Sequence, residues 1–289
     1  MSLDVLQEKI RKKKNPTMLQ LICSPMEVPL EFLQRAQSEA QACGSYFSAM
    51  LDLMKEVIPA VRFSFSSFAL LGPEGLTILS ELLRKASDLG YYVALDAPQI
   101  LSPLEASNTA SVLMGERGPY RFDGLVLSAY LGSDILKPFL APAKKSQKDV
   151  FVVCRTANKS ASELQDLLTG SRLVHMAAAD LVNRCGGNPG KFNFFPVGIV
   201  AAASSAESLR ILRASYPQLY MLLDGFDYPN SNARNCSFAF DQFGHGAVAC
   251  AGSVITAASL KAESGTWQEA SLAAAERVKK NLTRYTSIL

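Results

Sequence analysis

The sequence predicts an α/β fold, and within that class a closed (β/α)8 barrel of the TIM type with an extra N-terminal helix. Eight short apolar runs of strand length recur along the 289 residues, and helical patterns fill the intervals between them. Apolar strands that alternate with helices are typical of a parallel sheet buried on both faces, and eight such units close into a barrel of roughly 250 residues. Because the chain shows no internal repeat and no linker rich in Pro, Gly and Ser, we expect one domain over residues 1–289.

The predicted strands are the near-continuous apolar runs. In a barrel of this kind the functional site lies at the carboxyl ends of the strands. The residues that directly follow each run are therefore the candidates for function. The predicted strands cover residues 18–22, 60–65, 92–95, 124–128, 150–154, 197–201, 220–223 and 247–251.

The helical patterns carry recognisable end signals. Gly44 and Gly90 each follow a helical pattern, so we expect both glycines to terminate helices. Ser160 is followed three residues later by Glu163, which is a capping-box pattern at the start of a helix. The predicted helices cover residues 30–43, 73–89, 160–168, 205–215 and 268–285, and residues 1–15 form the extra helix that packs against the barrel.

The composition excludes several classes of protein. Hydrophobic residues make up 48% and charged residues 19%, as in ordinary soluble proteins, and a net charge of +3 does not indicate nucleic-acid binding. The sequence has no apolar run long enough for a membrane span and no signal-peptide pattern. Its six cysteines form no Cys-x-x-Cys motif, and neither His175 nor His245 has metal-ligand spacing. We therefore expect a cytoplasmic protein with reduced cysteines and no metal site.

Three segments together resemble one enzyme family. They read KIRKKKNPT at residues 9–17, FVVCRTAN at 151–158 and ELQDL at 163–167, and the stretch 123–140 adds a further match. These segments resemble the orotidine-5'-phosphate decarboxylase family, specifically its longer bacterial branch, and the resemblance covers nearly the whole chain. It implies a TIM barrel that removes CO2 from orotidine monophosphate to give UMP in pyrimidine biosynthesis, as a carboxy-lyase without metal or cofactor.

The resemblance also implies which positions would carry the reaction. The family uses an alternating Lys-Asp-Lys-Asp array, whose last aspartate comes from the partner in a homodimer, and a separate grip on the phosphate supplies binding energy. In this chain Asp96 stands unchanged and Arg62 takes the place of the first lysine, but Pro98 replaces the proton-donating lysine and Leu101 the partner's aspartate. Further replacements stand at Ile22 for the ribose aspartate, Ala157 for the pyrimidine serine, residues 224–229 for the phosphate loop and Ser253 for the phosphate arginine.

Proline and leucine offer no acid, whereas the family's carbanion must be protonated by a positioned one. We therefore predict that the decarboxylase activity is lost or greatly weakened and that the chain is a pseudoenzyme, which binds a ligand or a partner without catalysis. The ligand would be a nucleotide or sugar phosphate, and the partner a second copy or an active homologue. Two alternatives stay open, an active decarboxylase with atypical residues and an enzyme of altered chemistry on a phosphorylated sugar or nucleotide.

The candidate site residues have competing interpretations. Asp96 and Arg62 are the retained catalytic positions. They form a structural ion pair at neighbouring strand ends, or Asp96 acts as a general acid or base in new chemistry. The loop 224–235 is either a plain surface loop or a replacement ligand loop with Asn230, Ser231, Asn232 and Arg234 as donors. Gly252 and Ser253 form either a helix cap or an anion site. The candidate substrate-binding residues are Thr156, Asn158, Arg234 and Ser253.

Two further points depend on packing. The mouth of the barrel is either an open pocket, which favours binding, or a mouth plugged by Pro98, Leu101, Ile22 and Phe226, which favours a dead scaffold. Trp267 opens the last helical pattern, and we expect it to be a packing anchor rather than a ligand contact.

Overall fold

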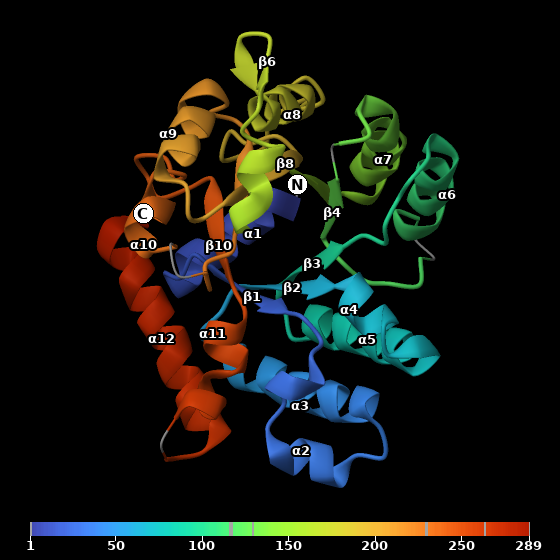
Figure 1. Cartoon of the computed structure of the whole chain (residues 1–289), viewed down its shortest axis with the longest axis vertical. Helices are drawn as coiled ribbons and strands as arrows, with labels where there is room; N and C mark the ends of the chain where they lie inside the picture. The colour runs from blue at the N-terminus through green and yellow to red at the C-terminus, as the bar shows by residue number, and fades with distance from the viewer. Residues whose placement is uncertain (1, 116–117, 129, 229–230, 263, 289) are drawn as a thin grey trace.

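Eight parallel strands close into a barrel in the order β1-β10-β9-β8-β5-β4-β3-β2 (Figure 1). The computed structural model describes residues 2–115, 118–128, 130–228, 231–262 and 264–288. Each predicted strand is confirmed, with ends within one residue of the prediction. The strands are β1 (Thr17–Leu21), β2 (Ala60–Ser64), β3 (Tyr92–Asp96), β4 (Gly124–Ser128), β5 (Asp149–Val153), β8 (Val197–Ala202), β9 (Tyr220–Asp224) and β10 (Ala247–Ala251).

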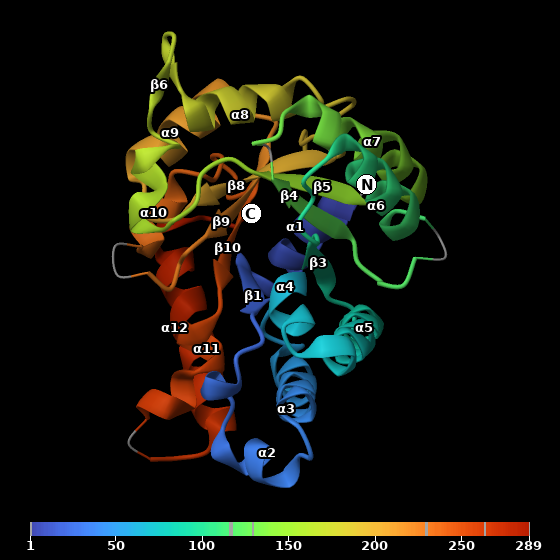
Figure 2. The same ribbon diagram turned by 45° about the vertical axis from the view of Figure 1, so that its right-hand side comes forward.

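Helices surround the barrel, as Figure 2 shows from a second side. None of the described helices combines the length and the apolar character needed to cross a membrane. A two-stranded hairpin, β6 (Leu168–Thr169) and β7 (Arg172–Leu173), projects from the loop after β5. The α-helices are α1 (Ser2–Lys13), α2 (Leu30–Arg35), α3 (Glu39–Met54), α4 (Phe65–Ala69), α5 (Gly72–Asp88), α6 (Pro103–Leu113), α7 (Ser133–Ser146), α8 (Val174–Asn183), α9 (Ala206–Ser215), α10 (Ala233–Ser237), α11 (Ser253–Thr256) and α12 (Trp267–Tyr285), and the 3-10 helices are η1 (Pro25–Glu27), η2 (Lys159–Glu163) and η3 (Ala258–Lys261).

The predicted helix over residues 30–43 is wrong, because the chain forms two helices there. Ser38 begins α3, and its side chain accepts a hydrogen bond from the backbone N–H of Gln41. Gly44 lies inside α3 rather than at its end. A Cβ atom at Gly44 would lie 2.9 Å from Cγ2 of Ile78 in α5, so the glycine serves the close approach of two helices. Gly90 follows α5 with a φ of 82°, as expected of a terminating glycine.

The predicted helix over residues 160–168 is also wrong. Only η2 forms there, and the chain then enters the hairpin β6–β7. The guanidinium of Arg155, just after β5, donates two hydrogen bonds of 3.0 and 2.8 Å to the carboxylate of Asp166. This pair holds the segment against the end of β5, and the tertiary contact overrides the local capping pattern.

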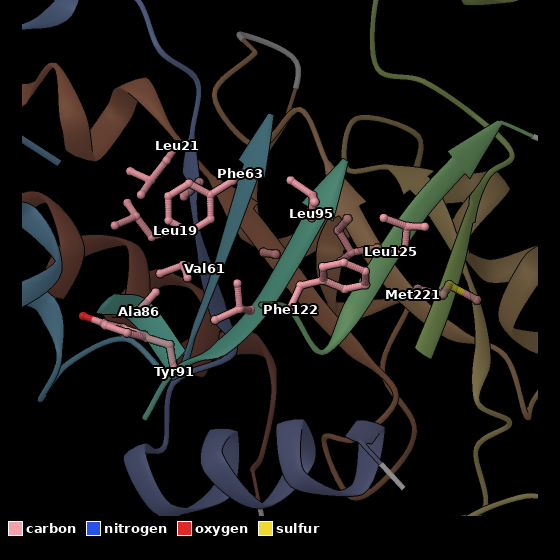
Figure 3. Packing of buried hydrophobic residues seen from close by; sticks show 14 of the residues in the cluster. Leu19, Leu21, Val61, Phe63, Ala86, Tyr91, Leu95, Phe122, Leu125 and Met221 are labelled. Carbon is pink, nitrogen blue, oxygen red and sulfur yellow. The ribbon is translucent and has the colours of Figure 1, made fainter. Parts of the chain in front are cut away.

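The strands carry apolar side chains on both faces. Outward side chains such as Leu19, Val61 and Phe63 pack against the surrounding helices (Figure 3). Inward side chains fill the barrel, and α1 closes its amino end. Figure 3 shows α1, in faint blue, beneath the strands. The predicted extra helix is therefore confirmed and supplies Leu3, Leu6 and Ile10 to the interior cluster.

A wholly buried carboxylate, that of Asp149, lies where α1 meets the barrel. The hydroxyl of Tyr92 donates a hydrogen bond of 2.9 Å to Asp149 Oδ2, and Ser2 and the backbone of Leu3 also donate to this carboxylate. Burial nevertheless raises the pKa of Asp149 to about 8. Its proton therefore stays on in the folded protein at a pH where the unfolded chain has already lost it.

Replacing Asp149 by asparagine is expected to change how stability depends on pH. Because the folded pKa lies above the unfolded one, the wild-type free energy of unfolding should fall by up to about 1.4 kcal/mol per pH unit between about pH 4 and about pH 8 from this residue alone. The Asp149→Asn variant lacks that dependence, so its free energy of unfolding should increase relative to that of the wild type as pH rises. Urea unfolding of both proteins across this window measures the difference. Parallel curves would contradict the assignment.

Candidate functional site

The carboxyl ends of the strands meet around one buried arginine. Arg62 points from β2 into the barrel, and only 6% of its side chain is exposed. Its Nε lies 2.7 Å from Oδ1 of Asp96 at the end of β3, and one terminal nitrogen lies 3.2 Å from Oδ1 of Asp224 at the end of β9. The same nitrogen lies 3.8 Å from Sγ of Cys250. The predicted ion pair between Arg62 and Asp96 is confirmed, and Asp224 is an additional partner.

The charges of Arg62, Asp96 and Asp224 influence one another's ionisation. Burial disfavours the guanidinium charge of Arg62, but the carboxylates of Asp96 and Asp224 outweigh it and raise the pKa of Arg62 well above its usual value. Burial also raises the pKa of Asp96, and the neighbouring guanidinium opposes that rise. Because Arg62 faces two carboxylates, its charge is already balanced, and the floor of the mouth carries a net negative charge when both carboxylates are ionised.

The mouth above this floor is open. Leu101 is 65% exposed and Ile22 48% exposed, so these side chains border the mouth instead of filling it, while Phe226 packs partly buried against the core. The first of two cavities, of about 340 Å³, is lined by Gln20, Ile22, Glu27, Asp224, Gly225, Asp227, Tyr228, Gly252, Ser253 and Thr256. The second, of about 450 Å³, is lined by Arg62, Asp96, Ala97, Pro98, Gln99, Ile100, Leu101, Val126, Leu127, Ser128, Tyr130, Leu131, Ile135 and Val153. We call them the acidic cavity and the apolar cavity.

Asp227 links the loop after β9 to the start of α11. The backbone N–H of Gly252 donates a hydrogen bond of 2.8 Å to Oδ2 of Asp227, and the hydroxyl of Ser253 lies 3.5 Å from the same oxygen. Burial raises the pKa of Asp227, while the backbone N–H groups of residues 252–254 lower it. At the predicted helix cap Gly252 is the capping residue and Ser253 the first helical one. A side chain of this protein therefore takes the donors that the anion interpretation reserved for a ligand.

The structure brings few of the predicted substrate-binding residues to the mouth. Ser253 lines the acidic cavity, whereas the described linings of both cavities lack the other three. The hydroxyl of Thr156 donates to Oδ1 of Asn158, so these two side chains engage each other. Arg234 is exposed in the short helix α10.

The other predicted donors of the loop after β9 serve the loop itself. The hydroxyl of Ser231 donates to the carbonyl oxygen of Gly225 at 2.6 Å, and Asn232 caps α10 through its side chain. Asn230, and Pro229 beside it, lie outside the described residues. The described part of this segment is therefore a self-bonded loop that contributes Asp224, Asp227 and Tyr228 to the acidic cavity.

Sequence reasoning missed Glu27 as a member of this site. Glu27 lies in η1, beyond β1, and its Oε2 is 3.5 Å from the hydroxyl of Thr256. Nothing in local spacing connects Glu27 with Asp224 and Asp227, because Glu27 lies about 200 positions before the other two in the chain. The only available signal was the placement of all three just after predicted strands that become neighbours when the barrel closes.

His175 takes part in a buried hydrogen-bond network and is not among the described lining residues of the two cavities. Its Nδ1 lies 2.9 Å from the carbonyl oxygen of Gln165 and 3.2 Å from Oδ1 of Asp166, and its Nε2 lies 3.2 Å from the hydroxyl of Ser208. The order Ser-His-Asp resembles a hydrolase triad, but Ser208 is buried and Arg155 already holds Asp166. Within the described ranges, no group of three or more His, Cys, Asp or Glu side chains could hold a metal ion.

Trp267 is a packing residue. It is 7% exposed, and its ring meets those of Phe32 and Tyr46 edge-on, with centroids 5.7 and 5.2 Å away. The hydroxyl of Tyr46 donates to the carbonyl oxygen of Thr256, which lines the acidic cavity. The aromatic cluster of Phe32, Tyr46 and Trp267 therefore supports the outer wall of that cavity.

Two known proteins with similar sequences are described as orotidine 5'-phosphate decarboxylases. The chain is 29% identical over 262 residues to the orotidine 5'-phosphate decarboxylase of Rhodopirellula baltica, which covers 86% of both chains. It is 23% identical to that of Caldicellulosiruptor saccharolyticus, over 85% of this chain and 86% of the relative. No family model matches the chain.

Two solved structures match nearly the whole chain. A Toxoplasma gondii protein described as an orotidine-monophosphate decarboxylase superimposes with a TM-score of 0.81 at 20% identity, over 98% of this chain and 96% of the other. The UMP synthase of Leishmania donovani superimposes with a TM-score of 0.75 at 25% identity, over 98% of this chain and 56% of the synthase. The closed eight-stranded barrel and these sequence matches agree, and the chain is a homologue of the orotidine 5'-phosphate decarboxylases.

Proposed function

We propose that this chain, as one barrel domain, has lost the decarboxylation of orotidine monophosphate and acts as a non-catalytic binding protein. One observation carries the proposal. Among the described residues that line the two cavities, Arg62 is the one lysine or arginine. It is held between Asp96 and Asp224, and Pro98 stands at the position that would supply a proton. Because proline has no acidic proton, Pro98 could not protonate a carbanion, and this supports the proposal.

The charge of the acidic cavity also disfavours binding of a nucleoside monophosphate, the substrate class of the relatives. Glu27, Asp224 and Asp227 line it, and no lysine or arginine is among its described lining residues. A nucleoside monophosphate that placed its phosphate there would meet three carboxylates in a partly desolvated space, where like charges repel more strongly than in water. Loss of phosphate binding and loss of the proton donor point in the same direction.

The proposal predicts that orotidine monophosphate and UMP do not stabilise the protein. A ligand at free concentration L that binds only the folded state stabilises it by RT ln(1 + L/Kd), so the melting temperature rises with the logarithm of ligand concentration once that concentration exceeds Kd. With either nucleotide at millimolar concentration, the melting temperature should stay at the value measured in matched sodium chloride. Thermal denaturation of the intact chain measures it. A melting temperature that rises with the logarithm of nucleotide concentration, and by more than inorganic phosphate raises it, would contradict the proposal.

The rim of the mouth is suited to a protein partner. Large apolar side chains on the loops after the strands are exposed there, and contiguous exposed apolar surface marks interaction sites. Apolar side chains on the rim of one copy can pack against the same side chains of a second copy, so we propose that two copies pair mouth to mouth through their rims. The exposed rim residues are Ile22, Met26, Leu30, Leu70, Leu101, Leu104, Leu131, Leu164, Leu167 and Tyr228.

Replacing Leu104 by aspartate is expected to break this pairing. Leu104 is 71% exposed in the first turn of α6, where an acidic residue suits the helix, so the fold should be kept. The wild type should show the mass of a dimer, and the Leu104→Asp variant should dissociate at least about tenfold more readily because a charge would be buried. Ile211→Asp on the outer side of α9 is the matched control. A wild type with the mass of a monomer would exclude pairing of two copies. A mixed dimer, seen when the chain is combined with an active decarboxylase, would mean that the rim binds that homologue instead of a second copy.

A further inference from the structure

The acidic cavity is built from three strand ends that are neighbours in the barrel. Glu27 follows β1, Asp224 ends β9 and Asp227 follows it, while Gly252 and Ser253 follow β10, which lies between β1 and β9. The cavity of about 340 Å³ is at the lower end of the range for small-molecule sites. It also lies at the end of the barrel where such folds bind their ligands.

Asp227 accepts hydrogen bonds from residues 252–254, whereas the protein satisfies the other two carboxylates only in part. Asp224 gives Oδ1 to Arg62, and Glu27 gives Oε2 to a long contact of 3.5 Å with Thr256. Among the described residues no donor reaches the second oxygen of either carboxylate. Burial raises the pKa of Glu27, and the charge of Asp227 raises it further. A cation bound in the cavity would therefore offset the repulsion between Glu27 and Asp227.

The remaining lining residues narrow the class of cation. Ile22 and the half-exposed ring of Tyr228 border the cavity and offer an apolar surface and an aromatic face. The described carboxylates are not grouped closely enough to hold a metal ion. An ammonium or guanidinium group, in contrast, can donate charge-assisted hydrogen bonds to separated carboxylates and pack its stem against an aromatic ring.

We propose that the acidic cavity binds a small organic cation, an ammonium or guanidinium group on an apolar stem. The inference rests on the proposed function, because it takes the cavity as a binding site that no longer receives a phosphate. Glu27 and Asp227 set this specificity by their charge, and Asp224 contributes while it remains bonded to Arg62.

Three cations and two matched controls test the inference on the intact chain. Phenethylamine, agmatine and spermidine are the cations, 2-phenylethanol is the neutral counterpart of the first, and inorganic phosphate is the anion. At least one cation should raise the melting temperature, with an effect that weakens in salt, and neither control should do so. Failure of all three cations, or an equal effect of 2-phenylethanol, overturns the proposal.

Two variants separate a bound cation from a general charge effect. The double variant Glu27→Gln, Asp227→Asn keeps the shapes of both side chains and should weaken binding of the effective cation by at least about tenfold. Glu31→Gln, on the exposed surface of α2, removes a charge outside the cavity and should leave binding unchanged. Equal binding of the cation by the wild type, the double variant and Glu31→Gln would contradict the assignment of the cation site to the acidic cavity. Because the single variants Glu27→Gln and Asp227→Asn are measured as well, a folding defect in the double variant leaves the test intact.

The same preparations distinguish this inference from the proposed function. Formation of UMP by the wild type would remove the proposed function, whatever the amines do. Absence of UMP together with absence of cation binding would remove the cation site alone and leave the non-catalytic barrel standing.

Discussion

Replacing Arg62 by methionine is expected to lower the free energy of unfolding by about 3 kcal/mol. Methionine fills a similar volume, so the loss comes from charge: Asp96 and Asp224 would face each other across the mouth without their common partner. Removing one member of a buried ion-pair network typically costs 3–5 kcal/mol, and the lower end applies because about a quarter of each carboxylate side chain is exposed. Urea unfolding at neutral pH measures the change.

A triple variant separates the charge effect from packing. Arg62→Met combined with Asp96→Asn and Asp224→Asn removes all three charges and should recover much of the lost stability. Lys85→Met breaks the exposed pair of Lys85 with Asp52, of 2.6 Å, and should cost at most about 1 kcal/mol. If Arg62→Met lowered the free energy of unfolding no more than Lys85→Met does, the ion pairs of Arg62 would not stabilise the mouth of the barrel.

Replacing Trp267 by alanine is expected to cost about 3 to 5 kcal/mol, the usual range for emptying a buried tryptophan site. The ring is buried between Phe32 of α2 and Tyr46 of α3, and it begins α12, so three helices lose a common contact (Figure 1). Denaturant unfolding measures the loss. It is followed by circular dichroism, because Trp267 is the single tryptophan of the chain and its replacement removes the tryptophan fluorescence signal.

The loss of stability should be smaller when the residue that replaces Trp267 is larger. Trp267→Phe keeps an aromatic ring in the cluster and should lose less than half as much as Trp267→Ala. Tyr285→Ala, at the exposed end of the same helix, should change stability by no more than about 0.5 kcal/mol. Equal losses for Trp267→Phe and Trp267→Ala would mean that the edge-on aromatic contacts contribute nothing beyond the shape of the indole.

The fold could be predicted because its signals are local and repeated. Each barrel strand is a continuous apolar run, and its ends are set by the change to polar residues. The two wrong helices failed for a tertiary reason. Gly44 serves the approach of α3 to α5, and Asp166 is drawn to Arg155, and neither contact leaves a trace in the neighbouring sequence.

The site could be predicted only in part. Arg62 and Asp96 lie on neighbouring strands, so their pairing followed from strand order alone. Asp224 reaches the same guanidinium from β9, and this contact depends on how far a long side chain extends across the closed barrel. The tether of Asp227 to Gly252 depends on the conformation of two loops, which residue type does not specify.

The central claim is that this barrel no longer decarboxylates orotidine monophosphate. The most direct measurement is UMP formation at high concentrations of the wild type and of Asp96→Asn, purified in parallel so that any contaminating decarboxylase is common to both. The account predicts that neither protein forms UMP above the rate without protein. UMP formation by the wild type that Asp96→Asn abolishes would contradict it.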